Sequence, residues 1–167
     1  MKGGIIMKIV PNLWFDNEAE DAAKLYTSIV KNSKITTVTT YPAAATEVAG
    51  KPAGSVMTVE FELDGNPFLA LNGGPEFTFN ESVSFAIECE DQQEVDYYWA
   101  KLTENGGEES VCGWLKDRFG LSWQVVPKRL NEIMADSNQK KVEAATAAFL
   151  QMKKLDIATI EKAYASA

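Results

Sequence analysis

A β-hairpin is encoded in SVMTVEFELDGNPFLALNGGP, residues 55–75. Residues 55–63 alternate between apolar and polar side chains, which is the pattern of a half-buried strand. Asp64-Gly65-Asn66 favours a tight hairpin turn. Residues 67–72 are therefore the returning strand, and Gly73-Gly74-Pro75 ends it.

The residues before this hairpin predict a strand, a helix and a second strand. Residues 8–15 read as the first strand, and residues 35–41 as the second, because they are rich in Thr, Val and Ile. Residues 18–30 place apolar side chains at helical spacing, behind Asp16 or Asn17 as a helix cap. Residues 42–54 are dominated by Ala, Pro and Gly and are expected to form a loop.

The same order of elements returns after the hairpin. Residues 82–89 read as a strand, and Asp91 caps a helix over residues 92–104 that ends at Asn105-Gly106-Gly107. One or two short strands fall within residues 109–115, and residues 121–126 form the last strand. The repeat lies in the organisation of the chain more than in residue identity.

The chain ends in a helical tail with an apolar face. Leu130 and Ile133 begin this face, and it continues at helical spacing from Val142 through Ile160. Such a face needs a cover, either from the rest of its own domain or from a partner subunit, and the sequence leaves both open.

Composition excludes several classes of function. The chain has 167 residues, a formal net charge of −8 and no histidine. An acidic protein repels nucleic acids and anionic membranes, and catalytic triads that use histidine are ruled out. The apolar run Ile5-Ile6-Met7 is too short for a signal peptide or a membrane span. Two cysteines without a disulfide framework, Cys89 and Cys112, suit a reducing compartment, so the prediction is a cytoplasmic protein.

The two faces of the predicted strands differ in chemistry. The bulkier apolar side chains are expected to pack against the helices, which leaves small polar groups on the other face. If the sheet curls, that face becomes a hydrogen-bonding cup for a ligand, although a simply solvated face is the alternative. The polar set consists of Thr58, Glu60, Asn72, Ser82, Ser84, Ser122 and Gln124.

Individual residues carry competing interpretations. Glu60 is a candidate general base if burial raises its pKa, and otherwise a solvated strand acid. Cys112 is a reactive thiol if Lys116 lowers its pKa, and otherwise a packed thiol. Trp14 and Trp114 are candidates for stacking on a planar ligand, or for packing in the core.

Four stretches resemble one known family. LWFDNEAEDAAKLY, LALNGGPEFTFNESVSFAIECED, EVDYYWAKL and CGWLKDRFGLSWQVVP are similar to the PhnB-like, or 3-demethylubiquinone-9 3-methyltransferase-like, branch of the vicinal-oxygen-chelate (glyoxalase, bleomycin-resistance and dioxygenase) superfamily. The resemblance covers about residues 9–134. It implies an α+β fold of paired βαβββ modules, residues 8–75 and 82–127, that form a cupped mixed sheet in a glyoxalase-like domain over residues 1–134. A helical tail, residues 135–167, follows, and a homodimer is expected.

The resemblance also indicates where a metal would bind. Metal-using members place His, Glu or Gln ligands on the first, fourth, fifth and eighth strands. The matching positions are Val10 or Asn12, then Asn72, Ser82 and Gln124, and none is His, Asp or Glu. Neutral amides and a hydroxyl are poor metal ligands, so no metal and no cofactor are expected.

These observations predict a metal-independent protein that binds a small molecule. Glu60 and Gln124 are its candidate catalytic residues, and its candidate ligand-binding residues are Asn12, Trp14, Thr58, Asn72, Ser82, Ser84, Trp114 and Ser122. The first alternative is a lyase, isomerase or dioxygenase with a weak carboxylate-bound metal. The second is a methyltransferase, as the family label suggests, although no strand leads through a Gly-rich turn into a helix.

Overall fold

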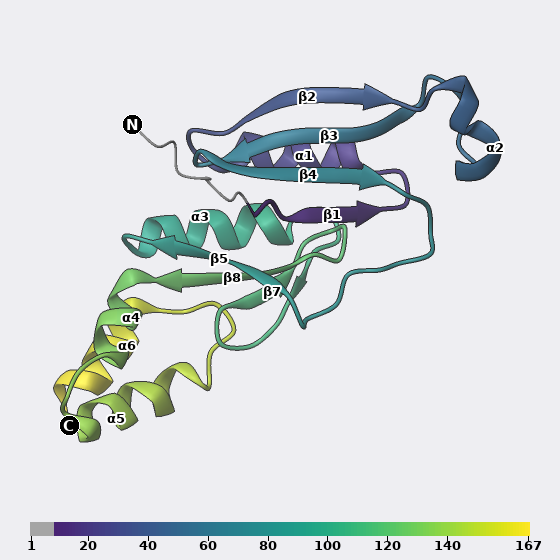
Figure 1. Ribbon diagram of the computed structural model, residues 1–167. Coiled ribbons are helices and arrows are strands. Elements are labelled where there is room, and N and C mark those ends of the chain that lie inside the picture. Colours follow the sequence, from purple (N-terminus) through teal and green to yellow (C-terminus); the bar gives the residue numbers. More distant parts are fainter. Residues whose placement is uncertain (1–8) are drawn as a thin grey trace, which may run out of the picture. The chain divides into compact units, whose positions relative to one another are not determined.

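The computed structural model describes residues 9–167, which divide into two compact units, one ending at Thr78 and the other running from Phe79 to Ala167 (Figure 1). The part of the expected first strand at Lys8 and the apolar run Ile5-Ile6-Met7 lie outside the described residues. Each unit has a four-stranded sheet of its own.

The first unit is a mixed sheet with one long helix. Its sheet order is β1-β4-β3-β2, with β1 parallel to β4 and the other neighbours antiparallel. Its elements are β1 (Asn12–Phe15), α1 (Ala19–Ile29), β2 (Lys34–Thr40), the 3₁₀ turn η1 (Ala43–Ala45), α2 (Thr46–Ala49), β3 (Val56–Leu63) and β4 (Asn66–Asn72).

The second unit repeats this arrangement and adds the helical tail. Its sheet order is β5-β8-β7-β6, again with only the first pair of neighbours parallel. Its elements are β5 (Ser84–Cys89), α3 (Gln92–Thr103), β6 (Glu108–Glu109), β7 (Trp114–Lys116), β8 (Ser122–Pro127), α4 (Lys128–Met134), α5 (Gln139–Phe149) and α6 (Ile157–Ala165). The predicted α+β fold of two βαβββ modules is therefore confirmed.

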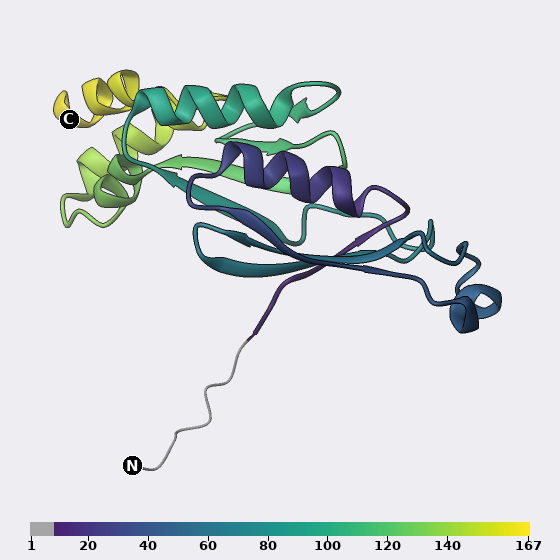
Figure 2. The same ribbon diagram turned by 90° about the horizontal axis from the view of Figure 1, so that it is seen from above.

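One face of each sheet is covered by the helix of the same unit (Figure 2). In the first unit, Ala22 and Ala23 are fully buried, and their small side chains let α1 lie close to the strands. Tyr26 of α1 packs on Phe61, which in turn stacks on Phe68 at a centroid distance of 5.3 Å. As predicted, Val59, Phe61 and Leu63 face this core.

The predicted Asp-Gly hairpin turn and the predicted Asp91 cap are confirmed. Asp64 and Gly65 both have positive φ, 46° and 74°, as a tight hairpin with Asp-Gly requires. Asp91 caps α3 by accepting a hydrogen bond from the Glu94 N–H at 2.9 Å. The loop expected over residues 42–54 instead contains η1 and α2, because its alanines allow short helical turns.

The helical tail packs on its own unit. Residues from α4, α5, α6 and the α5–α6 linker (residues 150–156) form one buried cluster of Leu130, Ile133, Ala145, Leu155 and Ile160. This settles the question that the sequence left open, since the most apolar face of the tail is covered within its own chain. None of the helices in residues 9–167 is long and apolar enough to cross a membrane.

Candidate functional site

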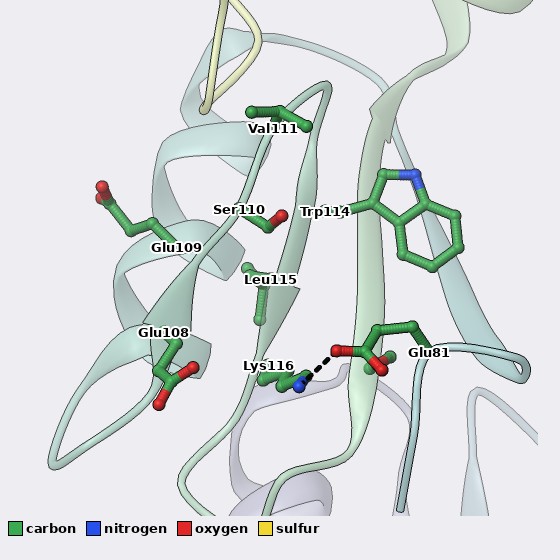
Figure 3. Close-up of a pocket in the computed structure, with 9 residues that line it drawn as sticks. Glu81, Glu108, Glu109, Ser110, Val111, Trp114, Leu115 and Lys116 are labelled. Atoms are coloured by element: carbon green, nitrogen blue, oxygen red, sulfur yellow. Dashed lines mark ion pairs between the residues drawn. The ribbon is translucent and has the colours of Figure 1, made fainter.

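A hollow of about 450 Å³ lies on the second unit, at the strands β6, β7 and β8 (Figure 3). Its size is within the range of small-molecule sites. Trp114, at the start of β7, offers a half-buried aromatic surface there. The hollow is lined by Glu81, Glu108, Glu109, Ser110, Val111, Trp114, Leu115, Lys116 and Ser122.

Ser122 is the buried polar group of this hollow. It is 1% exposed, and its hydroxyl has no hydrogen-bond partner among the described residues. The register pairs it with Lys116 on one side and Ser84 on the other, so these three side chains share one face of the sheet. A buried hydroxyl without a partner costs about 1–3 kcal/mol, which a polar ligand atom would recover in part.

A tight turn between β7 and β8 holds Lys116 and Ser122 in place. The buried carboxylate of Asp117 accepts hydrogen bonds from the Phe119 and Leu121 N–H groups at 2.9 and 3.1 Å. Its second oxygen accepts from the Trp123 indole at 2.8 Å. Because one carboxylate joins the turn to the core, the backbone that carries Lys116 and Ser122 is restrained on both sides of the turn.

Charges in the hollow are mostly paired. Lys116 forms an ion pair with Glu81, drawn as a dashed line in Figure 3, and this contact raises the pKa of Lys116 and lowers that of Glu81. Glu109 accepts a hydrogen bond from the Trp99 indole at 2.8 Å, which lowers its pKa, and it also pairs with Lys153 at 3.5 Å. The charges within each of these ion pairs cancel, which leaves the negative charge of the Glu108 carboxylate. The hollow therefore suits a neutral or cationic molecule better than an anion.

Gln124 and Ser84, two of the predicted site residues, lie together beside the hollow. Gln124 Nε2 donates to Ser84 Oγ at 2.9 Å, and the register places Gln124 directly opposite Trp114. The structure thus brings together Ser84, Trp114, Ser122 and Gln124 on one face of the second sheet.

Within the first unit, four of the predicted site residues lie on one face of its sheet. Asn12, Trp14, Thr58 and Glu60 share the face of the first sheet opposite α1. Asn12 and Glu60 line a second hollow, of about 350 Å³. Trp14 is held by its own unit, since its indole donates to the Gly74 carbonyl at 2.8 Å and packs edge-on against Phe77.

The placement of Asn72 on the polar face was wrong. Asn72 is 6% exposed and shares a face with Phe15, which packs in the core. Its Oδ1 accepts from the Ala19 N–H at 2.8 Å, and its Nδ2 donates to the Val56 carbonyl at 3.1 Å. The first helical N–H of α1 is therefore satisfied by a strand residue, and neither Asp16 nor Asn17 caps the helix.

The placement of Ser82 in the fifth strand was also wrong. The strand begins at Ser84, and Ser82 is an exposed turn residue whose N–H and hydroxyl both donate to Asn80 Oδ1. By accepting these bonds, the Asn80 side chain satisfies the Ser82 N–H without a neighbouring strand, and this favours a turn at Ser82. Val83, one of the bulkier apolar side chains of the expected strand over residues 82–89 and so expected to pack against a helix, is consequently 63% exposed.

The residues present do not fit a metal. Among residues 9–167, no three His, Cys, Asp or Glu side chains gather closely enough to hold an ion. The amides of Asn72 and Gln124 are already engaged in hydrogen bonds, and Asn12 Nδ2 donates to the Val10 carbonyl at 2.8 Å. Cys89 is no ligand either, because burial raises the pKa of its thiol to about 12.

Part of the hollow has no signal in the local sequence. Glu81 and residues 108–111 line it, yet they belong to a turn, to a strand of only two residues and to the irregular segment after that strand. Such short elements show no alternation of polar and apolar side chains. The Glu81–Lys116 pair joins residues 35 positions apart, and no local pattern signals that contact.

Comparison with known proteins agrees with this architecture. A structure of a putative 3-demethylubiquinone-9 3-methyltransferase, a PhnB protein from Bacillus cereus, is 28% identical, with a TM-score of 0.64 over 72% of this chain and 99% of that one. The PA1353 protein of Pseudomonas aeruginosa is 18% identical, with a TM-score of 0.56 over 72% and 97%. The fosfomycin resistance protein FosX of Listeria monocytogenes is 13% identical, with a TM-score of 0.55 over 80% and 100%, which is a likeness of fold.

The paired βαβββ units and these neighbours define a protein of the vicinal-oxygen-chelate superfamily. Within that class, residues 7–126 match the family model described as 3-demethylubiquinone-9 3-methyltransferase, and the chain belongs to this family. The description is a family name and does not assign methyl transfer to this chain. No functionally curated protein matches the sequence.

Proposed function

We propose that this chain binds a small molecule in the hollow of the second unit, without a metal. The observation that carries the proposal is the buried hydroxyl of Ser122, which has no partner among the described residues and lies where the hollow meets the sheet. Trp114 supplies a flat apolar surface above the same strands. The ligand expected from this combination is planar and largely apolar, with a hydrogen-bonding group for Ser122.

The charge of the hollow further restricts the class of ligand that is expected to bind. Glu81 already neutralises Lys116. Glu108, which is the partner of Lys116 in the pairing of β6 with β7, adds a negative charge. An anionic ligand would have to displace Glu81 from Lys116, whereas a neutral ligand would not. We therefore expect a neutral aromatic probe to bind more tightly than its carboxylate analogue.

We assign the Gln124 and Ser84 side chains the role of orienting the ligand. Their mutual hydrogen bond fixes the Gln124 amide beside Trp114. Glu60, the other predicted catalytic residue, is an exposed strand acid of the first unit. We propose no reaction step through it.

Calorimetric titration with 2-naphthol and 2-naphthoate tests the proposal. We expect saturable binding of 2-naphthol, weaker binding of 2-naphthoate, and a loss of about tenfold or more in affinity for Trp114→Ala, since stacking contributes about 0.5–1.5 kcal/mol beyond the buried area. Ser122→Ala is expected to weaken binding as well. Phe77→Ala is the matched control, because it removes an exposed aromatic side chain from the other unit. Absence of binding, or equal loss in the control, would refute the assignment of this hollow.

The association state is a separate part of the proposal. We expect a homodimer, which sedimentation of the full chain would detect as a doubled mass. The tail buries its main apolar cluster within its own unit, so the dimer should not depend on that cluster. A monomer at micromolar concentration would contradict the expectation.

A further inference from the structure

The α5–α6 linker, residues 150–156, runs beside one wall of the hollow. This wall consists of residues 110–113, of which Ser110 and Val111 line the hollow. The Cys112 N–H donates to the Met152 carbonyl at 2.7 Å, and the Gly113 N–H donates to the Lys153 carbonyl at 2.8 Å. Figure 3 shows the linker in pale yellow near the bend that carries Val111.

The backbone of the wall adopts a conformation that is intrinsically unfavourable at Cys112. Cys112 and Gly113 both lie in the left-handed region, with φ of 56° and 83°. This region costs a non-glycine residue about 1 kcal/mol or more. Within the bend, the Trp114 N–H offsets part of this cost by donating to the Val111 carbonyl at 3.0 Å, and contacts from outside the bend add to this stabilisation. The two hydrogen bonds to the linker are such contacts, and the bond from Val125 N–H to the Gly113 carbonyl at 2.8 Å ties the same bend to β8.

The linker is itself anchored to the rest of the second unit. Leu155 is fully buried in the tail cluster. The Gln92 side chain of α3 donates to the Leu155 carbonyl at 3.1 Å and accepts from the Ile157 N–H at 2.9 Å. Lys153 and Lys154 pair with Glu109 and Asp96. One side chain, Gln92, thus holds the Leu155 carbonyl near the end of the linker and the first N–H of α6.

We propose that the α5–α6 linker acts as a strut that fixes the wall of the hollow, with Gln92 as its positioning residue. The strut comes from a part of the chain beyond residues 7–126, which are the residues that match the family model. The tail therefore contributes to ligand affinity through the wall, without contacting the ligand. This inference rests on the hollow being the binding site.

Hydrogen exchange and titration of the full-length Gln92→Ala variant test the strut. The variant removes the bonds of the Gln92 side chain to Leu155 at the end of the linker and to Ile157 at the start of α6, together with its bond to Asp96 at 3.1 Å, and it changes no residue of the Leu155 cluster. We expect the amides of Cys112 and Gly113 to exchange about tenfold faster, since each lost bond contributes about 1 kcal/mol. The affinity for 2-naphthol should fall about fivefold, because the competent wall is less populated. Gln93→Ala, which truncates an exposed neighbour on α3, should change neither quantity.

Two comparisons separate a strut from a general loss of stability. The amides of Asp117 and Leu121 are bonded within the β7–β8 turn and do not touch the linker, so their exchange should be unchanged. Equal acceleration at these amides would overturn the inference. Unchanged affinity in Gln92→Ala, with the wild type binding normally, would also overturn it while leaving the proposed function intact. A wild type that binds no probe would instead refute the proposed function and, with it, the effect on affinity.

Discussion

At the scale of the residue, Gly113 combines a left-handed backbone with a lack of space for a side chain. Its φ is 83°, and a Cβ there would lie 2.9 Å from the Val125 carbonyl oxygen and 3.0 Å from Leu155 Cδ1. Glycine is therefore required both for its left-handed backbone and for lack of space.

The change Gly113→Ala is expected to lower the free energy of unfolding by about 2–4 kcal/mol, as measured by urea denaturation. Gly120→Ala is a closely matched control, because Gly120 has nearly the same φ, 84°, and a Cβ added there would meet no atom within 4 Å. It should cost about 1 kcal/mol, which is the backbone part alone. Equal losses in the two variants would show that the contact with Val125 and Leu155 contributes nothing.

Asn72 has a structural role in the first unit, and its substitution separates that role from ligand binding. Its side chain joins the start of α1 to β3, so Asn72→Ala should destabilise the first unit by about 1–3 kcal/mol in thermal unfolding. Binding of 2-naphthol should be unaffected, since Asn72 does not line the hollow of the second unit. Asn12→Ala, an exposed amide on the same sheet, is the control. A specific loss of ligand affinity in Asn72→Ala would show instead that Asn72 belongs to the ligand-binding site.

At the scale of the element, α6 is stabilised by its N-terminal cap. Asp156 accepts from the Thr159 N–H at 2.7 Å, and bonds to Thr159 hold the pKa of Asp156 below its ordinary value of 3.8. A carboxylate whose pKa is lower in the folded state contributes stability above its unfolded pKa. This contribution is lost as the pH falls through the folded pKa, because the unfolded chain binds the proton more readily.

Asp156→Asn should therefore reduce the acid sensitivity of the tail. Asparagine keeps the capping oxygen, so the two proteins should differ little at pH 7. Between about pH 5 and pH 3 the wild type should lose stability more steeply than the variant, as followed by helical circular dichroism. Glu143→Gln on α5 removes an exposed carboxylate without changing a cap and serves as the control. Parallel curves of stability against pH for the wild type and Asp156→Asn would contradict the role of the Asp156 carboxylate in the acid sensitivity of the tail.

At the scale of the whole molecule, the proposed metal independence is tested by thermal melting. A metal at a hundredfold excess over its dissociation constant would contribute about 2.7 kcal/mol and raise the melting temperature by roughly 5–10 °C. We expect Zn²⁺, Ni²⁺ and Mn²⁺ to shift melting of the EDTA-treated protein by less than about 1 °C. A larger stabilisation by one ion, abolished by Glu60→Gln, would instead favour the carboxylate-bound metal alternative.

Local sequence determined most of the secondary structure, because its signals act over a few residues. The Asp-Gly turn, the Asp91 cap and the alternation of Val59, Phe61 and Leu63 each follow from backbone geometry and side-chain period. The repeated order of elements then predicted two similar units, which the two sheets confirm.

Only the tertiary structure decided which face of β4 is buried and which residues complete the hollow. Both faces of β4 carry apolar side chains, so alternation could not show that Asn72 lies under α1, where a helix N–H needs an acceptor. The pairing of Glu81 with Lys116, and of residues 112–113 with 152–153, joins segments far apart in the chain. Such contacts depend on how the elements pack, and no pattern within one segment encodes them.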